Sequence, residues 1–164
     1  MIISILCVDK NYGIGKNNDL LFHLPLDMKF FRETTKGHTV FMGENTLLSF
    51  PNSKPLPNRK NVVLSQDVTH NYEGCENVHN FDEFVKILRN YGENEDVFVI
   101  GGASIYRQTL PFVDEVLLTK VDADGEATVF FPNLDEMPEW NCIEESEPVQ
   151  DGEYKIRFCK YVRK

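Results

Sequence analysis

The sequence lacks the features that mark membrane, secreted and nucleic-acid-binding proteins. Its 164 residues contain no apolar run as long as a membrane span, and the start at Met1–Leu6 has no basic n-region of a signal peptide. Lys and Arg number 17 against 26 Asp and Glu, and the resulting net charge of −9 argues against a basic face for DNA or RNA. We therefore expect a soluble cytoplasmic protein.

Several motifs of catalytic chemistry are also missing. No CxxC pair occurs, so we expect reduced and mostly structural thiols at Cys7, Cys75, Cys142 and Cys159. The four histidines, His23, His38, His70 and His79, have no ligand spacing, which argues against a metal site. No GxSxG elbow is present, and the absence of a full GxGxxG fingerprint argues against an ordinary Rossmann dehydrogenase.

What the sequence does contain is an alternation of short β-branched runs with helical stretches. This order predicts an α/β domain whose mostly parallel sheet is covered on both faces and closed by antiparallel strands. The expected apolar strands are Ile2–Val8, Thr39–Met42, Asn61–Leu64, Val97–Ile100 and Val116–Val121, followed by an antiparallel edge hairpin at Trp140–Glu145 and Tyr154–Val162. The expected helices are Pro25–Lys36, Glu44–Phe50, Asp82–Tyr91 and Ser104–Leu110, with Asn90-Tyr91-Gly92 ending the third.

Asp27 is a single carboxylate within a strongly apolar segment, Leu20 to Phe31. Pro25 suits the first position of a helix, which places Asp27 in the first turn, on the same face as Phe30 and Phe31. Such an acid is either a helix-end charge turned to solvent or a buried acid with a raised pKa.

Glycines follow two of the expected strands at the points where helices begin. Gly101-Gly102 comes after one strand, and Gly43 comes after another, with the hydroxyl of Thr46 nearby. Each turn is either a tight strand–helix connection or a place where backbone amides approach a phosphate, and two such turns suit the two phosphates of a dinucleotide. The glycine-rich segment Gly13–Asp19 is a mobile lid or a solvent loop, and Arg59 is a solvated cation or a clamp for a substrate carboxylate.

Taken in order along the chain, these segments resemble the dihydrofolate reductase family over essentially the whole length, and residues 1–164 are expected to form one such domain. The fold that this implies is a central, mostly parallel eight-stranded sheet with an antiparallel C-terminal hairpin and about four flanking helices. The residues that carry the resemblance are Ile14-Gly15-Lys16, Leu24-Pro25-x-Asp27, Phe31, Val40-Phe41-Met42-Gly43-x-x-Thr46, Pro55–Asn61, Ile100-Gly101-Gly102-Ala103-x-x-Tyr106, Leu118-Thr119 and Phe130-Phe131-Pro132.

The resemblance implies reduction of 7,8-dihydrofolate to tetrahydrofolate by hydride from NADPH, which supplies one-carbon metabolism. Asp27, supported by Thr119 and with Phe22 beside it, would anchor the pterin ring and promote its protonation. The implied substrate-binding residues are Ile5, Cys7, Met28, Phe31, Phe50, Leu56 and Arg59, with Arg59 pairing the glutamate tail. The implied cofactor-binding residues are Ile14, Gly15, Gly43, Glu44, Asn45, Thr46, Ser65, Gln66, Ile100, Gly101, Gly102, Ala103, Ser104, Ile105 and Tyr106. The implied partners are dihydrofolate and antifolates such as diaminopyrimidines and methotrexate-like pteridines, and the protein is expected to be a monomer.

The sequence departs from the family pattern at four places. Phe22 stands where the family usually has tryptophan, which removes an N–H that helps to order a water near the acid. Glu44 stands where arginine usually faces the 2′-phosphate of NADPH, so repulsion of that phosphate and an unusual tolerance of NADH are expected, with Ser65 and Gln66 as neutral donors. Thr128-Val129 replaces a common Asp-Thr pair near the lid, and Cys7 replaces a frequent alanine.

Two other interpretations stay open from the sequence. One is a reductase of the same fold that acts on another heterocycle, such as the reductase of riboflavin synthesis, which the register of Asp27 and Arg59 opposes. The other is a non-catalytic ligand-binding relative in which Phe22 and Glu44 mark a decayed site. Retention of Asp27, Thr46, Arg59 and the glycine pair opposes decay.

Overall fold

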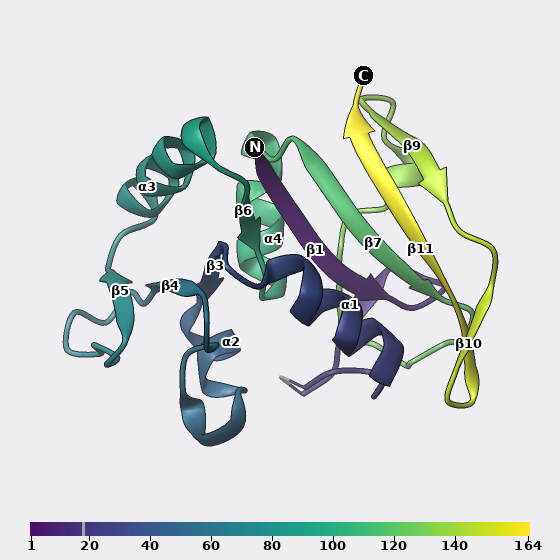
Figure 1. Ribbon diagram of the computed structural model, residues 1–164, viewed down its shortest axis with the longest axis horizontal. Coiled ribbons are helices and arrows are strands. Elements are labelled where there is room, and N and C mark those ends of the chain that lie inside the picture. Colours follow the sequence, from purple (N-terminus) through teal and green to yellow (C-terminus); the bar gives the residue numbers. More distant parts are fainter. Residues whose placement is uncertain (18) are drawn as a thin grey trace.

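A twisted mixed sheet with helices on both faces forms the body of the protein in the computed structural model, which describes residues 1–17 and 19–164 (Figure 1). Its strand order is β10-β11-β7-β1-β6-β3-β4-β5, with β9 also paired to β11. The strands are β1 Ile2–Val8, β3 Thr39–Gly43, β4 Lys60–Leu64, β5 Cys75–Val78, β6 Val97–Val99, β7 Glu115–Val121, β9 Trp140–Glu145, β10 Val149–Asp151 and β11 Tyr154–Arg163. The α-helices are α1 Pro25–Thr35, α2 Glu44–Leu48, α3 Phe81–Asn94 and α4 Ala103–Thr109, with short 3-10 turns at Pro51–Ser53, Leu110–Phe112 and Leu134–Glu136.

The strand pairing confirms the predicted fold class. β7, β1, β6, β3, β4 and β5 are parallel to one another, whereas β11 pairs antiparallel with β7, β9 and β10. A second, two-stranded sheet of β2 (Gly13–Gly15) and β8 (Val129–Phe130) lies outside the large one. Within the described ranges, no helix has both the length and the apolar character needed to cross a bilayer.

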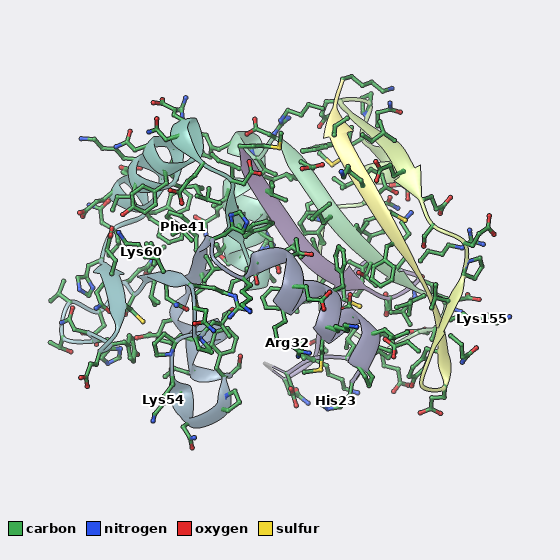
Figure 2. The ribbon with its side chains drawn as sticks, in the orientation of Figure 1. His23, Arg32, Phe41, Lys54, Lys60 and Lys155 are labelled. Carbon is green, nitrogen blue, oxygen red and sulfur yellow. The ribbon has the colours of Figure 1, made fainter. Side chains whose placement is uncertain are left out.

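Both faces of the parallel strands are apolar because each face packs against helices. Residues such as Phe41 and Val99 join the side chains of α3 and α4 in one buried cluster. Their strand neighbours Val40 and Phe98 point the other way and pack with Phe31 of α1. Figure 2 shows side chains filling these layers, with Phe41 in the interior and Lys54 and Lys155 at the surface. Double burial explains why these strands are almost continuously hydrophobic.

Helix α3 is longer than its sequence signals predict. Asn90-Tyr91-Gly92 was expected to end the helix at Tyr91, and this prediction is wrong because α3 runs on to Asn94. The glycine serves packing instead: a Cβ at Gly92 would lie 2.6 Å from Cγ1 of Ile2 on β1. A side chain there would push the helix off the sheet, so Gly92 is retained inside the helix despite its low propensity.

Strands β2, β5, β8 and β10 were also not expected from the sequence. Each has at most four residues, too few to show the alternation that identifies a strand. β2 is organised by the buried carboxylate of Asp9, whose Oδ1 accepts from the amides of Asn11 (2.8 Å) and Gly13 (2.7 Å). Its Oδ2 accepts from the amide of Gly125 at 3.0 Å, which joins the β2 segment to the loop before β8.

The start of α1 depends on a residue far away in the sequence. Its N-cap, Leu24, has no side chain that can accept a hydrogen bond, and Pro25 fills the first helical position. The carboxylate of Asp151, at the end of β10, accepts instead from the amides of Leu26 (3.1 and 3.2 Å) and Asp27 (3.1 Å). Asp151 is only 2% exposed, so the cap is buried and connects the C-terminal hairpin to α1.

Replacing this cap therefore has a predictable cost. Asp151→Ala leaves two first-turn amides without their acceptor and is expected to lower the free energy of unfolding by about 1–2 kcal/mol. Asp151→Asn keeps one acceptor oxygen and serves as the control, with a smaller loss. Urea denaturation of both variants measures the effect, and equal stability of the alanine variant and the parent would contradict a capping role.

Candidate active site

Asp27 lies in the first turn of α1, and its side chain reaches the central strands β1 and β7. Cys7 and Thr119 are direct partners in the β1–β7 ladder, on the face of the sheet that α1 covers. The hydroxyl of Thr119 donates to Oδ1 of Asp27 at 2.7 Å. The predicted support of Asp27 by Thr119 is thus present as a hydrogen bond in the structure.

Burial is the main influence on the protonation of Asp27. Desolvation raises the pKa of its carboxyl, and the negative charge of Asp151 raises it further. Hydrogen bonds from Thr119 and from the thiol of Cys7 act in the opposite direction. Of the two interpretations that the sequence allows, the structure supports an acid with a raised pKa, because the half-buried carboxylate is bonded to Thr119 of the sheet.

The thiol of Cys7 can act only as a donor in this setting. Burial and the charge of Asp27 both raise the pKa of Cys7 well above the ordinary value for cysteine, so the group stays protonated at neutral pH. All four cysteines are free, as expected from the absence of a CxxC motif.

An apolar wall continues from the carboxylate across the α1 face of the sheet. Five of the residues singled out from the sequence pack in a single cluster: Ile5, Phe31, Phe50, Leu56 and Ile100. Met28 on α1 is 50% exposed, and two further leucines are exposed, Leu20 before α1 and Leu48 at the end of α2. Exposed large apolar side chains are typical of the rim of a site for an apolar ligand.

Arg59 is held in place by the protein and keeps donors to spare. Its Nε donates to Thr35 Oγ1 (2.9 Å), and its two terminal nitrogens donate to the carbonyls of Pro57 (2.6 Å) and Arg32 (3.1 Å). Burial and the neighbouring charge of Arg32 lower the pKa of Arg59, although a guanidinium remains protonated. Two N–H groups out of five stay available, which suits a clamp for a carboxylate.

The two glycine turns predicted for phosphate binding come together at the ends of β3 and β6. The amide of Gly43 donates to the carbonyl of Gly101 at 2.9 Å. Gly101 has φ +132°, and a Cβ there would lie 3.1 Å from the hydroxyl of Thr46. The corresponding distance for Gly102 is 3.5 Å. The positive φ of Gly101 favours glycine at this position, and the turn brings its backbone close to the hydroxyl of Thr46.

Other residues expected to bind a cofactor have supporting positions. The buried hydroxyl of Tyr106 donates to the carbonyl of Ile5 at 2.7 Å, and Ile105 packs against Gly43. Both side chains therefore hold the glycine turns and the floor of the site. Of the remainder, Ile14 and Gly15 lie on β2, Ala103 and Ser104 open α4, and Asn45 and Gln66 are exposed.

Glu44 has neighbours that sequence reasoning did not identify. Its carboxylate lies against Ser65, His70 and Tyr72, so the hydroxyl of Ser65 already has an acceptor inside the protein. No spacing rule links positions 44, 70 and 72, and only the closeness of the ends of β3 and β4 brings them together.

Phe22 also has a defined place. Its ring packs edge-on against Tyr154, with centroids 4.8 Å apart, in the cluster of Leu24 and Cys7. It brings an apolar edge, and no hydrogen-bond donor, to the neighbourhood of Asp27.

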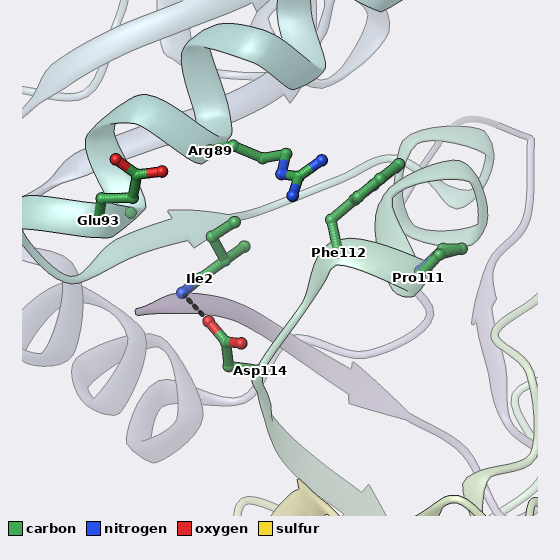
Figure 3. Close-up of a pocket in the computed structure, with 7 residues that line it drawn as sticks. Ile2, Arg89, Glu93, Pro111, Phe112 and Asp114 are labelled. Carbon is green, nitrogen blue, oxygen red and sulfur yellow. Dashed lines mark hydrogen bonds between the residues drawn. The ribbon is translucent and has the colours of Figure 1, made fainter.

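A separate surface hollow of about 290 Å³ lies at the start of β1, beside Ile2 and at the other end of this strand from Cys7 (Figure 3). It is lined by Ile2, Arg89, Glu93, Phe112 and Asp114, and none of these is a predicted site residue. Among residues 1–17 and 19–164, no three His, Cys, Asp or Glu side chains are grouped as metal ligands.

Comparison with known proteins identifies relatives over the full length. A family model described as dihydrofolate reductase matches residues 1–163. A dihydrofolate reductase of Bacillus subtilis (strain 168) is 35% identical, covering 100% of this chain and 95% of the relative. One of Staphylococcus haemolyticus is 32% identical, covering 99% and 95%. A solved dihydrofolate reductase from Enterococcus faecalis, complexed with NADP(H) and RAB-propyl, has a TM-score of 0.85 and 31% identity, covering 99% of this chain and 96% of that one.

The contact between Cys7 and Asp27 gives a testable pH effect. Cys7→Ala removes a donor to the ionised carboxylate and is expected to raise the pKa of Asp27 further, whereas Cys7→Ser keeps a hydroxyl donor and largely preserves it. The carboxyl carbon of Asp27, followed by ¹³C NMR over a pH series, reports this directly. A fall in the pKa of Asp27 in the alanine variant would contradict this influence of Cys7.

Proposed function

The chain belongs to the dihydrofolate reductase family, and we propose that Asp27, Thr119, Arg59 and the glycine turns at Gly43 and Gly101 carry out its reaction. The protein is an NADPH-dependent dihydrofolate reductase that forms tetrahydrofolate for one-carbon metabolism. The observation that carries the assignment of the site is the half-buried Asp27 carboxylate, held by Thr119 at one end of an apolar wall.

Dihydrofolate fits this arrangement by its two unlike ends. The amide-like edge and 2-amino group of the pterin would donate to the carboxylate of Asp27, and the ring would lie against Ile5 and Phe31. The spare N–H groups of Arg59 would pair with the α-carboxylate of the glutamate tail in the bidentate geometry that a guanidinium favours. Phe50, Leu56, Met28 and Cys7 complete the apolar surface between the two polar ends.

Asp27 would act on the substrate through a proton. A buried carboxylate with a raised pKa favours a protonated pterin, because the pair is neutral in a setting that penalises a lone charge. Protonation makes the ring a better hydride acceptor, and water would be the immediate carrier of the proton to the ring nitrogen. Thr119 acts by positioning, because its hydrogen bond fixes the orientation of the carboxylate, and both Thr119 and Cys7 limit how far the pKa of Asp27 rises.

The residues at the ends of β3 and β6 fit the cofactor. The close approach of Gly43, Gly101 and Thr46 would bring backbone amides and the Thr46 hydroxyl to the phosphates. NADPH, when bound, supplies the hydride to the neighbouring pterin carbon. Ile14, Gly15 and Ile100 would line the nicotinamide and exclude water from the two rings. Amides at Asn45, Gly102, Ala103 and Ser104 remain candidates for the phosphates.

The same anchor accounts for inhibitor binding. Diaminopyrimidines and methotrexate-like pteridines present an amino-substituted ring that can pair with Asp27 as the pterin does. We also propose that the protein acts as a cytoplasmic monomer, since its four cysteines are all free and its excess negative charge suits neither nucleic acid nor membranes.

The central experiment follows the absorbance of NADPH in the presence of dihydrofolate. Asp27→Asn is expected to lower kcat/KM about 100-fold or more, because it removes the group that promotes proton transfer. It also removes the fall in activity with rising pH that the raised pKa of Asp27 contributes, since an amide does not titrate. Glu33→Gln, which removes an exposed charge from the same helix, is the matched control.

The result separates the competing interpretations. NADPH oxidation with another heterocycle but not with dihydrofolate would favour a different reductase of this fold. Dihydrofolate binding without turnover would favour a non-catalytic relative. Unchanged kinetics of Asp27→Asn would overturn the assignment of Asp27.

Phe22 gives a second test of the proton route. Phe22→Trp adds an N–H beside the site and is expected to lower KM for dihydrofolate several-fold by ordering the proton-carrying water. Its pH profile of kcat/KM should shift as well, and Phe22→Tyr tests a different donor at the same position. If Phe22→Trp alters neither KM nor the pH profile, the missing indole does not limit proton delivery.

A further inference from the structure

The carboxyl ends of the parallel strands form a row that continues past the two glycine turns at Gly43 and Gly101. In sheet order, β6 is followed by Gly101, β3 ends at Gly43, β4 is followed by Ser65 and β5 by His79. Ligands of open parallel sheets bind along such carboxyl ends. With the nicotinamide at the β1 and β6 end, a dinucleotide that crosses the two glycine turns reaches the ends of β4 and β5 with its adenosine.

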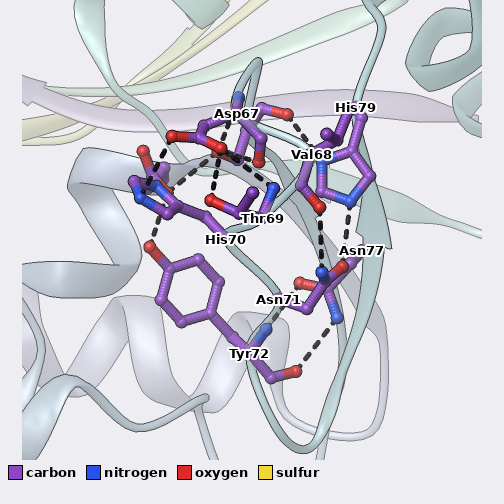
Figure 4. Close-up of polar contacts among 10 residues, drawn as sticks. Asp67, Val68, Thr69, His70, Asn71, Tyr72, Asn77 and His79 are labelled. Carbon is purple, nitrogen blue, oxygen red and sulfur yellow. Dashed lines mark hydrogen bonds and ion pairs between the residues drawn. The ribbon is translucent and has the colours of Figure 1, made fainter.

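Three hydrogen-bond donors converge on one oxygen at this end of the row, and Figure 4 shows two of them, His70 and Tyr72, with the loop that carries them. Glu44 Oε2 lies 2.9 Å from Ser65 Oγ, 2.7 Å from His70 Nδ1 and 2.5 Å from the hydroxyl of Tyr72. Ser65 and Tyr72 donate as hydroxyls, and His70 donates when Nδ1 carries a proton. These donors keep Glu44 ionised: the hydrogen bond from Tyr72, then those from Ser65 and His70, lower its pKa.

The loop that carries these donors has its own framework, independent of Glu44. The Asp67 carboxylate accepts from the amide (2.9 Å) and hydroxyl (2.6 Å) of Thr69. The ring of His79 contacts the carbonyl of Ser65 and the side chain of Asn71, each at 2.9 Å. Asn77 donates to the carbonyl of Tyr72 at 3.0 Å. The loop that carries the three donors is therefore held by contacts other than Glu44, and His70 Nε2 also lies 3.3 Å from Asp67 Oδ2.

Convergence of several donors on one oxygen is what a bound phosphate requires, and here a side chain of the protein fills the position. We propose that Ser65, His70 and Tyr72 form a receptor for the phosphate monoester on the cofactor ribose, and that Glu44 occupies it as an internal competitor. NADPH must displace Glu44 to reach the donors, whereas NADH can leave Glu44 there and donate its 2′-hydroxyl to the carboxylate. The enzyme consequently discriminates weakly between the two cofactors.

This inference rests on the proposed function for its cofactor, so its test uses binding as well as turnover. The probes are adenosine 2′,5′-bisphosphate and adenosine 5′-monophosphate, which differ only in the 2′-phosphate. The Kd of each is measured by calorimetry. Glu44→Ala is expected to increase the preference for the bisphosphate by about tenfold or more, because three donors become free and a repulsive charge is lost.

Two variants separate the receptor from a general effect of charge. Glu73→Ala removes an exposed acid of the same loop that makes no side-chain hydrogen bond or ion pair among the described residues, and it should change the preference less than about threefold. Tyr72→Phe in the Glu44→Ala background should return a part of the gain, because one donor to the phosphate is lost. Steady-state kinetics should show a matching rise in the ratio of kcat/KM for NADPH to that for NADH.

The outcomes test the roles of Glu44 and Tyr72 separately. An unchanged preference in Glu44→Ala, or an equal gain in Glu73→Ala, would overturn the competitor role of Glu44. A gain that Tyr72→Phe does not reduce would overturn the donor role of Tyr72. If the parent oxidises neither cofactor with dihydrofolate, the proposed function fails, while the two probes still report on the receptor.

Discussion

The desolvation of a single carboxylate is the constraint around which the site is built. The half-buried Asp27 is in contact with polar groups from distant segments: Thr119 from β7 and Cys7 from β1. Asp151 fixes the start of α1 by accepting hydrogen bonds from the first amides of this helix, and its charge raises the pKa of Asp27 as well. One buried cap thus couples the stability of α1 to the protonation of the active-site acid.

The sheet provides the other half of the arrangement. Its two apolar faces pack against different helices, so the parallel strands are rigid and their carboxyl ends form a continuous edge. Close approaches at Gly43 and Gly101 leave backbone at the middle of this edge, and the donors around Glu44 lie further along it. Hydride transfer therefore depends mainly on how the strand order positions the two rings relative to each other. It depends little on side chains that themselves react.

Local signals in the sequence were sufficient for much of this picture. Apolar runs identified the central strands, Pro25 identified the start of α1, and the glycine pair identified a turn with close approach. Contacts between distant segments were not accessible: Asp151 caps a helix 125 residues away, and His70 meets Glu44 only through strand pairing. Gly92 misled the prediction because its requirement comes from Ile2 on another element and not from its own helix. Strands of two to four residues have no pattern to detect.

The most direct test of the account is a crystal structure of the protein with folate and NADP⁺ bound. We expect the Asp27 carboxylate to accept two hydrogen bonds of about 2.6–3.2 Å from the pterin edge. The Thr119 contact should be retained, and the nicotinamide should lie beside Ile14 and Ile100. A pterin bound away from Asp27, or a carboxylate turned to solvent in the complex, would contradict the claim that its burial organises the reaction.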